Sequence, residues 1–166
     1  METYKSKVWV LGDDIDTDII IPTDYLALKT IEDMKKYAFS PLRPELAGQI
    51  TEGDVIVAGK NFGCGSSREQ APEIIKALKV KCVIAKSFAR IFFRNAINNG
   101  LLLIENPDLH DVVEEGQEIE ICVNQFIKCN GKEYPIASLP QNLVDIINAG
   151  GLVQAMRKQN GLEPLK

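Results

Sequence analysis

Three short aliphatic runs constrain the fold of this chain more than any other feature. They are Asp54–Ala58, Cys82–Ala85 and Leu101–Ile104, and each is too short for anything but a buried strand. The segments between them, Glu69–Leu78 and Phe88–Asn98, have the apolar spacing of helices. Strands separated by helices of this length predict βαβ units and a parallel sheet.

The residues before this region predict three more elements. Lys7–Leu11 is an apolar strand that ends at Gly12. Ile19–Ile21 is β-branched and stops at Pro22, which favours another short strand. Ile31–Phe39 has helical spacing.

The pattern changes after Gly116. Glu118–Val123 alternates apolar and polar residues, Phe126–Cys129 follows closely, and Asn130-Gly131 is a strong hairpin signal. Leu143–Asn160 is helical on both sides of a glycine pair. We therefore predict an α/β fold in which residues 1–166 form a single domain, with a mixed sheet flanked by helices.

Composition excludes several classes of function. With 166 residues, 45% hydrophobic and 25% charged, the chain has the size and balance of one globular domain. Its net charge of -4 argues against a nucleic-acid partner. No apolar run is long enough to span a membrane, and the polar start Met1–Lys7 is not a signal peptide. We expect a cytoplasmic protein.

The cysteines and the histidine predict no metal centre in this chain. Cys64, Cys82, Cys122 and Cys129 lack the clustered spacing of iron–sulfur ligands, and Cys82 and Cys122 have the surroundings of core residues on strands. The only histidine, His110, is predicted to be an exposed helix residue.

The segment Asn61–Gln70, with the sequence NFGCGSSREQ, joins a predicted strand to a predicted helix. Gly63 and Gly65 can take a positive φ and expose their N–H groups. The helix start adds further free N–H groups, so this segment predicts an anion site. It is not a P-loop, because no lysine precedes the hydroxyl residue, and it lacks the third glycine of the dinucleotide fingerprint.

Three side chains of this loop are suited to chemistry on a carboxylate. Arg68 can grip a carboxylate with two parallel N–H bonds, Ser67 lies beside it, and Ser66 is a hydroxyl that surrounding positive potential can hold as a base. The alternative is a plain helix cap with a surface arginine. The helix start also has two readings: Ser67 and Gln70 have capping-box spacing, whereas Pro72 favours a start at residue 71 or 72.

Four aspartates, Asp13, Asp14, Asp16 and Asp18, follow the first predicted strand. Such a cluster can hold a cation, but turn and capping roles fit the spacing better. Asp18, next to Thr17, is the one expected to help organise a site.

Four segments together resemble the swivelling domain of the aconitase family. The resemblance covers roughly residues 8–105, and its motifs agree with the family in order and spacing. They are Gly12–Pro22, Asn61–Gln70, Ile84–Phe92 and Asn95–Gly100.

The resemblance implies a swivelling β/β/α domain that works as half of an enzyme. A separate large subunit, in a heterodimer or heterotetramer, would carry a 4Fe–4S cluster. The reaction would remove water from a small hydroxy-dicarboxylic acid and add it back at the neighbouring carbon. By the same resemblance Ser66 would be the base, and Ser67 and Arg68 would bind substrate. Thr17, Asp18, Gly63, Gly65 and Arg90 would support them.

Two positions qualify this resemblance. Many relatives carry a histidine where this chain has Gln70, which cannot titrate, so only a hydrogen-bonding or capping role remains there.

The segment Tyr25, Leu26, Ala27 and Leu28 resembles the loop that senses the substrate's variable group. Homoaconitase-like relatives tend to place an arginine in it.

The apolar Ala27 and Leu28 suit an alkyl group and would leave an extra carboxylate unpaired. We therefore expect an alkyl-malate substrate: 2- and 3-isopropylmalate of leucine biosynthesis, or dimethylmalate, rather than homocitrate. The alternative is that Leu26 and Leu28 are core residues of a short helix. The rival functions are a phosphate-binding regulatory module and a scaffold that has lost catalysis.

Overall fold

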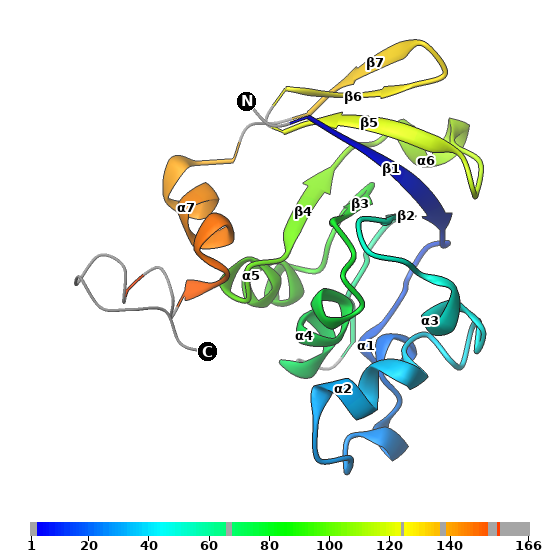
Figure 1. Cartoon of the computed structure of the whole chain (residues 1–166), viewed down its shortest axis with the longest axis vertical. Coiled ribbons are helices and arrows are strands. Elements are labelled where there is room, and N and C mark those ends of the chain that lie inside the picture. The colour runs from blue at the N-terminus through cyan, green and yellow to red at the C-terminus, as the bar shows by residue number, and fades with distance from the viewer. Residues whose placement is uncertain (1–2, 66–67, 124, 137–138, 153–155, 157–166) are drawn as a thin grey trace.

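The computed structural model describes residues 3–65, 68–123, 125–136, 139–152 and 156. The strands in this part of the chain form one sheet in the order β4-β3-β2-β1-β5-β6-β7 (Figure 1). They are β1 (Thr3–Val10), β2 (Val55–Ala58), β3 (Cys82–Ala85), β4 (Leu102–Glu105), β5 (Glu118–Cys122), β6 (Phe126–Cys129) and β7 (Lys132–Pro135).

The long strand β1 joins a parallel half of the sheet to an antiparallel half. Its last residues, Val8–Val10, pair in parallel with β2, and β3 and β4 continue this half. Its first residues, Thr3–Lys7, pair antiparallel with β5, which begins the β5–β6–β7 meander. The βαβ prediction and the predicted hairpin are both confirmed, and Asn130 and Gly131 take the positive φ values of a tight turn.

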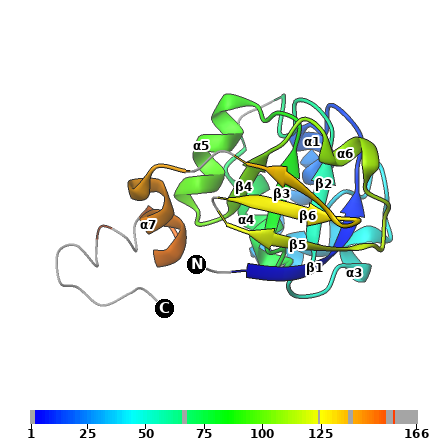
Figure 2. The ribbon, with the colours of Figure 1, turned by 90° about the horizontal axis from the view of Figure 1, so that it is seen from above.

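Helices cover one face of the parallel half, and the meander folds over the other (Figures 1 and 2). The described helices are α1 (Thr17–Ile20), α2 (Ile31–Met34), α3 (Leu46–Gln49), α4 (Gln70–Ala77), α5 (Arg90–Asn98), α6 (Leu109–Val112) and α7 (Gln141–Ala149). Helices α1 to α5 supply the core under the covered face, whereas Leu109 of α6 and Ile147 of α7 pack with the core on the meander side. Two short 3-10 turns, η1 (Thr23–Tyr25) and η2 (Lys35–Tyr37), lie in the N-terminal part.

The parallel strands are buried on both faces, which explains their continuous aliphatic runs. Ile56 and Val83 belong to the core beneath the helices. Val57 and Ile84 belong to a second core between the parallel strands and the meander. A strand with water on one side would instead alternate apolar and polar residues, as Glu118–Ile121 of β5 do.

The predicted strand Ile19–Ile21 is wrong. Asp16 caps a helix here by accepting a hydrogen bond from the Ile19 N–H at 2.9 Å, so α1 forms in place of a strand. Ile20 and Ile21 are fully buried. Capping and burial therefore outweigh the strand preference of β-branched residues.

Two other boundaries differ from prediction. The helix expected over Ile31–Phe39 breaks into α2 and η2 and ends at Tyr37, because Ala38 has a ψ of 135° and Phe39 a φ of 61°. The helix expected from Leu143 begins at Gln141 and has its C-cap at Gly150, in the left-handed region. The last part of that prediction, residues 153–155 and 157–160, lies outside the described residues.

Candidate active site

Two loops that follow neighbouring parallel strands form the candidate site. Two backbone hydrogen bonds join the loop after β1 to the loop after β2. The Gly63 N–H donates to the Ile15 carbonyl at 2.7 Å, and the Thr17 N–H donates to the Cys64 carbonyl at 2.9 Å. Since the carboxyl ends of parallel strands meet at one edge of a sheet, the topology itself brings these loops together.

The four aspartates hold this loop pair in place. Asp13 accepts from the Lys60 N–H at 2.7 Å, and Asp14 accepts from the Asn61 side-chain amide at 3.2 Å. Asp16 caps α1, and Asp18 pairs with Arg68. The predicted capping role is confirmed for Asp16, whereas Asp13, Asp14 and Asp18 bind residues of the second loop. Within the described part of the chain no three His, Cys, Asp or Glu side chains gather as metal ligands.

Gly63 and Gly65 have the positive φ values that were predicted, 84° and 90°. A Cβ at Gly63 would lie 2.2 Å from the ring of Phe92, so the loop packs directly on α5. A Cβ at Gly65 would lie 3.3 Å from the Asp16 side chain. Both glycines therefore serve the loop in two ways: they allow its positive φ values, and their lack of a side chain allows its close packing on Phe92 and Asp16.

The predicted base Ser66 and its neighbour Ser67 lie outside the described residues. The residues on either side of them, Gly65 and Arg68, both line a cavity of about 220 Å³. The helix after the loop begins at Gln70, one residue before the range favoured by Pro72, and its N-cap Glu69 makes no side-chain capping bond.

Arg68 is the best-anchored side chain of the site. It is 14% exposed. Its Nη1 donates to the Ile21 carbonyl at 2.8 Å, and its Nη2 donates to the Thr23 hydroxyl at 2.8 Å. Nη2 also lies 2.5 Å from the Asp18 carboxylate. All three partners belong to one short segment around α1, which therefore sets the position of the guanidinium.

The cavity beside Arg68 also reveals residues that the sequence analysis did not single out as site residues. It is lined by Thr17, Gly63, Gly65, Arg68, Ala89, Arg90, Ile91, Phe92 and Asn95. Ile91 and Asn95 are four residues apart on α5, which places them on the same helix face, and Ile91 is 55% exposed. Once α5 is recognised as starting at Arg90, this spacing is the signal that points to Asn95.

Arg90 lines this cavity as the first residue of α5. Ala89, not the nearby Ser87, is the residue that precedes the helix. The Ser87 hydroxyl instead accepts a hydrogen bond from the Asn61 N–H at 2.8 Å. Ser87 therefore anchors the Gly-rich loop.

The predicted substrate-sensing segment does not line the cavity of this chain. Leu26 and Leu28 pack partly buried against the core beneath the helices, but they follow η1 rather than form part of a helix, and Ala27 is exposed. The Tyr25 ring stacks on the Tyr37 ring, with centroids 4.0 Å apart. The segment is linked to the site through Thr23, which accepts from Arg68.

The cysteines are free thiols, and burial makes three of them harder to ionise. Burial and the nearby Asp16 and Asp14 carboxylates raise the pKa of the Cys64 thiol. Burial raises the pKa of Cys82 to about 12 and also raises that of Cys129. Cys82 and Cys122 are buried strand residues, as predicted.

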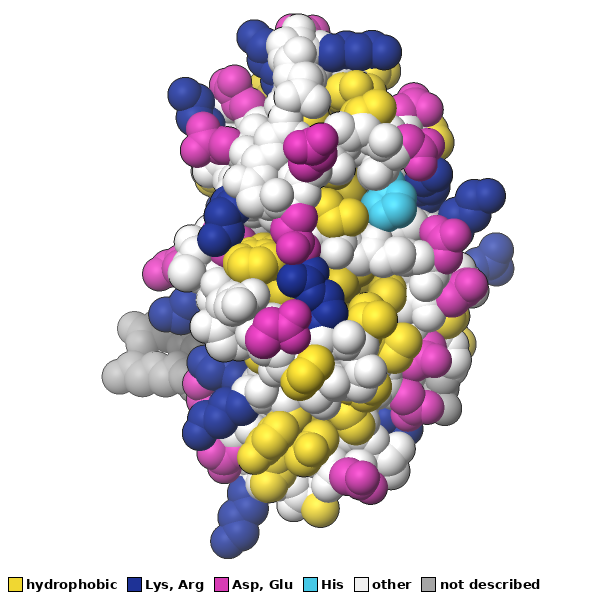
Figure 3. Space-filling model, turned by 90° about the vertical axis from the view of Figure 1, so that its right-hand side faces the viewer, with side chains coloured by type: hydrophobic (Ala, Val, Ile, Leu, Met, Phe, Trp, Pro, Cys, Tyr) yellow, Lys and Arg dark blue, Asp and Glu magenta, His cyan; other side chains and the backbone are white. Residues whose placement is uncertain are grey.

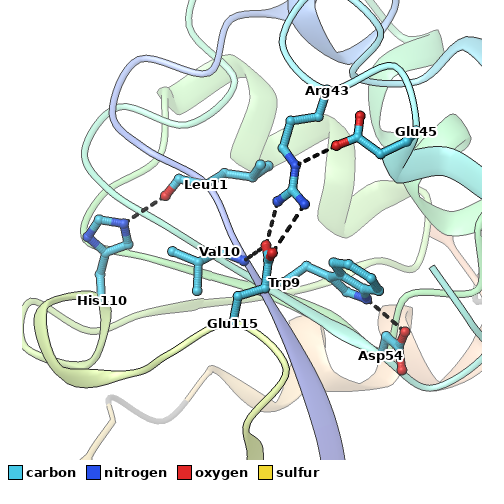
Figure 4. A network of polar contacts seen from close by, with 8 residues as sticks. All are labelled: Trp9, Val10, Leu11, Arg43, Glu45, Asp54, His110 and Glu115. Atoms are coloured by element: carbon cyan, nitrogen blue, oxygen red, sulfur yellow. Dashed lines mark hydrogen bonds and ion pairs between the residues drawn. The ribbon is translucent and has the colours of Figure 1, made fainter. Parts of the chain in front are cut away.

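A polar network fixes the end of β1, from which the first site loop departs (Figure 4). Arg43 bridges Glu115 and Glu45, and Glu115 also accepts from the Val10 N–H at 3.2 Å. The Glu115 carboxylate raises the pKa of Arg43, and the Arg43 guanidinium lowers that of Glu115. Figure 3 shows a basic side chain enclosed by acidic ones on this face.

His110 belongs to the same network. The Leu11 carbonyl accepts a hydrogen bond from its Nε2 at 2.7 Å, so the imidazole links α6 to the first site loop (Figure 4). His110 lies on a helix, as predicted, but it is partly buried rather than exposed. On β1 itself, the Trp9 indole N–H donates a hydrogen bond to the buried Asp54 carboxylate at 2.8 Å.

Within the described residues, no helix has both the length and the apolar content of a membrane span.

Comparison with known proteins shows the family to which this chain is similar. Residues 43–109 match the family described as the Aconitase C-terminal domain. The 3-isopropylmalate dehydratase small subunit of Lachnospira eligens is 80% identical over 162 residues, which cover 98% of this chain and 99% of that protein. The small subunit 1 of Archaeoglobus fulgidus is 50% identical over 151 residues, 89% of this chain and 93% of that protein.

A solved structure agrees with the sequence relatives. The crystal structure of 3-isopropylmalate dehydratase from Methanocaldococcus jannaschii superimposes with a TM-score of 0.89 at 41% identity, and covers 96% of both chains. The mixed, curled sheet described above is therefore the fold of a known enzyme subunit. This chain belongs to the family of 3-isopropylmalate dehydratase small subunits, which are hydro-lyase subunits of the aconitase superfamily.

Proposed function

We propose that this chain, paired with a cluster-bearing large subunit, interconverts 2- and 3-isopropylmalate by removing and re-adding water. The observation that carries the proposal is the cavity lined by both Arg68 and Gly65, the residue directly before Ser66. The whole chain, residues 1–166, would act as one swivelling domain. We further propose a cytoplasmic complex, in keeping with four free cysteines.

Arg68 is proposed to bind a substrate carboxylate. A guanidinium matches the planar shape of a carboxylate and can donate two parallel hydrogen bonds to it. The anchoring of Arg68 to Ile21 and Thr23 reduces the entropy that is lost when substrate binds.

Ser66 is proposed to be the base that takes a proton from the substrate carbon, with Ser67 as a substrate contact. A serine hydroxyl is a weak base, so its alkoxide needs strong stabilisation. The positive φ values of Gly63 and Gly65 turn the backbone of this loop, and Arg68 brings a positive charge within two residues. Charge and backbone N–H groups in a site that excludes water can supply that stabilisation.

The 4Fe–4S cluster is proposed to belong to the large subunit. The residues described in this chain offer no group of three His, Cys, Asp or Glu side chains that could hold a metal ion. A cluster bound to the partner would supply a Lewis acid for the hydroxyl that leaves. The chain itself contributes a base, a carboxylate clamp and part of the cavity wall.

The proposed substrate is an alkyl-malate because the cavity combines a cation with apolar side chains. Ala89, Ile91 and Phe92 line the same cavity as Arg68. Tyr25, Leu26, Ala27 and Leu28 would complete the apolar surface if the large subunit closes over this face. An extra carboxylate, as in homocitrate, would remain unpaired against such a wall and lose affinity.

Anaerobic co-expression of the chain with its large subunit tests this function. The purified complex is assayed on 3-isopropylmalate, 2,3-dimethylmalate and homocitrate. We expect the highest kcat/KM on 3-isopropylmalate. Turnover of homocitrate alone would overturn the substrate assignment, and a complex that turns over none of the three would overturn the hydro-lyase function.

A further inference from the structure

Arg68, the proposed substrate clamp, already holds a carboxylate from its own chain. The Asp18 Oδ1 lies 2.5 Å from Nη2 of Arg68, and the Thr23 hydroxyl lies 2.8 Å from the same nitrogen. The Asp18 side chain is 61% exposed, whereas Arg68 is 14% exposed. The aspartate thus reaches the guanidinium from the water-exposed side.

The crowding at Nη2 matters because of the shape of a guanidinium. A carboxylate can grip it at its end, through Nη1 and Nη2, or along its side, through Nε and Nη2. Both grips use Nη2. In this structure Nη2 has two oxygen neighbours, so a substrate carboxylate cannot take a two-point grip unless one of them moves.

Asp18 is the neighbour that a substrate can replace. Its carboxylate is chemically equivalent to that of the substrate, so the ion pair between Asp18 and Arg68 is replaced by one between the substrate and Arg68. Thr23 is neutral and does not repel a second carboxylate, whereas Asp18 left in place would put two negative charges on one cation. An ion pair this exposed is also weak, because water screens it.

We propose that Asp18 is an internal stand-in for the substrate: its carboxylate occupies Arg68 in the empty site and is displaced when the substrate carboxylate binds. Asp18 is thereby a positioning residue that keeps Arg68 aimed at the cavity and competes with substrate for it. The inference rests on the proposed role of Arg68 as the carboxylate clamp.

Asp18→Asn in the complex with the large subunit tests the competition. The asparagine keeps the shape of the side chain and removes its charge. We expect KM for 3-isopropylmalate to fall about threefold to fivefold, the size set by one exposed ion pair, with kcat within about twofold of wild type. An unchanged or raised KM would overturn the proposal. If Asp18 only oriented Arg68 for substrate, its replacement would raise KM.

Asp24→Asn is the matched control. Asp24 is an exposed carboxylate in η1, close in sequence to Asp18, and no contact joins it to Arg68 in the described structure. Its substitution removes the same charge from the same surface. We expect no change in KM, and an equal fall in both variants would mean that net charge, not Asp18, is responsible.

A second measurement does not depend on turnover. The full chain, labelled with ¹⁵N, is titrated with malonate while the Nε–Hε resonance of Arg68 is followed by NMR. We expect Asp18→Asn to lower the apparent Kd for malonate by about threefold or more. An equal or higher Kd would overturn the proposal. If the wild-type complex fails to turn over 3-isopropylmalate, the proposed function fails and this titration still decides the role of Asp18.

Discussion

Gly63 is packed so closely on the Phe92 ring that no other residue fits there. We predict that Gly63→Ala destabilises the chain by about 2–4 kcal/mol, because a Cβ would meet the ring at 2.2 Å and φ is 84°. Urea denaturation measures this loss. Gly131→Ala, at a similar φ of 79° with open space around it, serves as control and is expected to cost only about 1–2 kcal/mol. Equal losses in both variants would contradict the packing argument.

Residue types alone predicted part of the site. The positive φ of Gly63 and Gly65 and the burial of Cys82 follow from chemistry that is local to each residue. The partners of Arg68 do not, because Ile21 and Thr23 are more than forty residues away in sequence. Ala89, Ile91 and Asn95 were also missed, since only the packing of α5 on the loop places them on the cavity.

At the scale of single elements, the short helix α1 carries the anchors of Arg68. We predict that Asp16→Ala, which removes the cap of α1, costs about 1 kcal/mol and raises KM for substrate severalfold. Steady-state kinetics of the complex and urea denaturation of the chain measure the two effects.

Thr30→Ala is the control for this prediction. Thr30 caps α2 through a hydrogen bond from the Asp33 N–H at 3.1 Å, and it has no contact with Arg68. A similar stability loss with an unchanged KM is expected. A rise in KM for both variants would show that any weakened cap disturbs the site.

The bridge between Arg43 and Glu115 joins the loop before α3 to the turn before β5. Arg43 lowers the pKa of Glu115 from its usual 4.5, so the folded state binds this proton less tightly than the unfolded state. The stabilisation is therefore present above pH 4.5 and is lost as pH falls through the lower, folded value. It amounts to about 1 kcal/mol or less, because Glu115 is partly exposed.

We predict that Glu115→Gln lowers the free energy of unfolding by this amount at pH 7 and by little near pH 3. Urea denaturation of both proteins across this range checks the difference. A loss that is the same at both pH values would mean that the charge of Glu115 contributes nothing.

The elements themselves were predicted where periodicity was strong. Strands β2, β3 and β4 and helices α4 and α5 appear within two residues of their expected positions. The error at Ile19–Ile21 arose because its residues prefer strands, whereas the cap at Asp16 and the burial of Ile20 decide the structure. Short elements such as α1 and α2 depend on tertiary contacts, which a single sequence does not display.

At the scale of the whole molecule, we propose that the chain forms half of an active site. It offers a clamp, a proposed base and an apolar wall, but the described residues gather no ligand set for a metal. We predict that the purified chain alone is colourless and does not turn over 3-isopropylmalate, and that activity appears on addition of the large subunit. Absorbance near 400 nm (about the region of iron–sulfur clusters) and an activity assay of each preparation check this. Turnover by the chain alone would contradict it.

The role of Ser66 is the central claim, and one substitution tests it most directly. The complex carrying Ser66→Ala is assayed anaerobically on 3-isopropylmalate beside wild type and a Ser40→Ala control, whose serine lies in a turn away from the cavity. We predict a fall in kcat of about 10²–10⁴ for Ser66→Ala, the range for loss of a general base, with little change in KM because Arg68 remains. Full turnover by the Ser66→Ala complex would contradict the assignment.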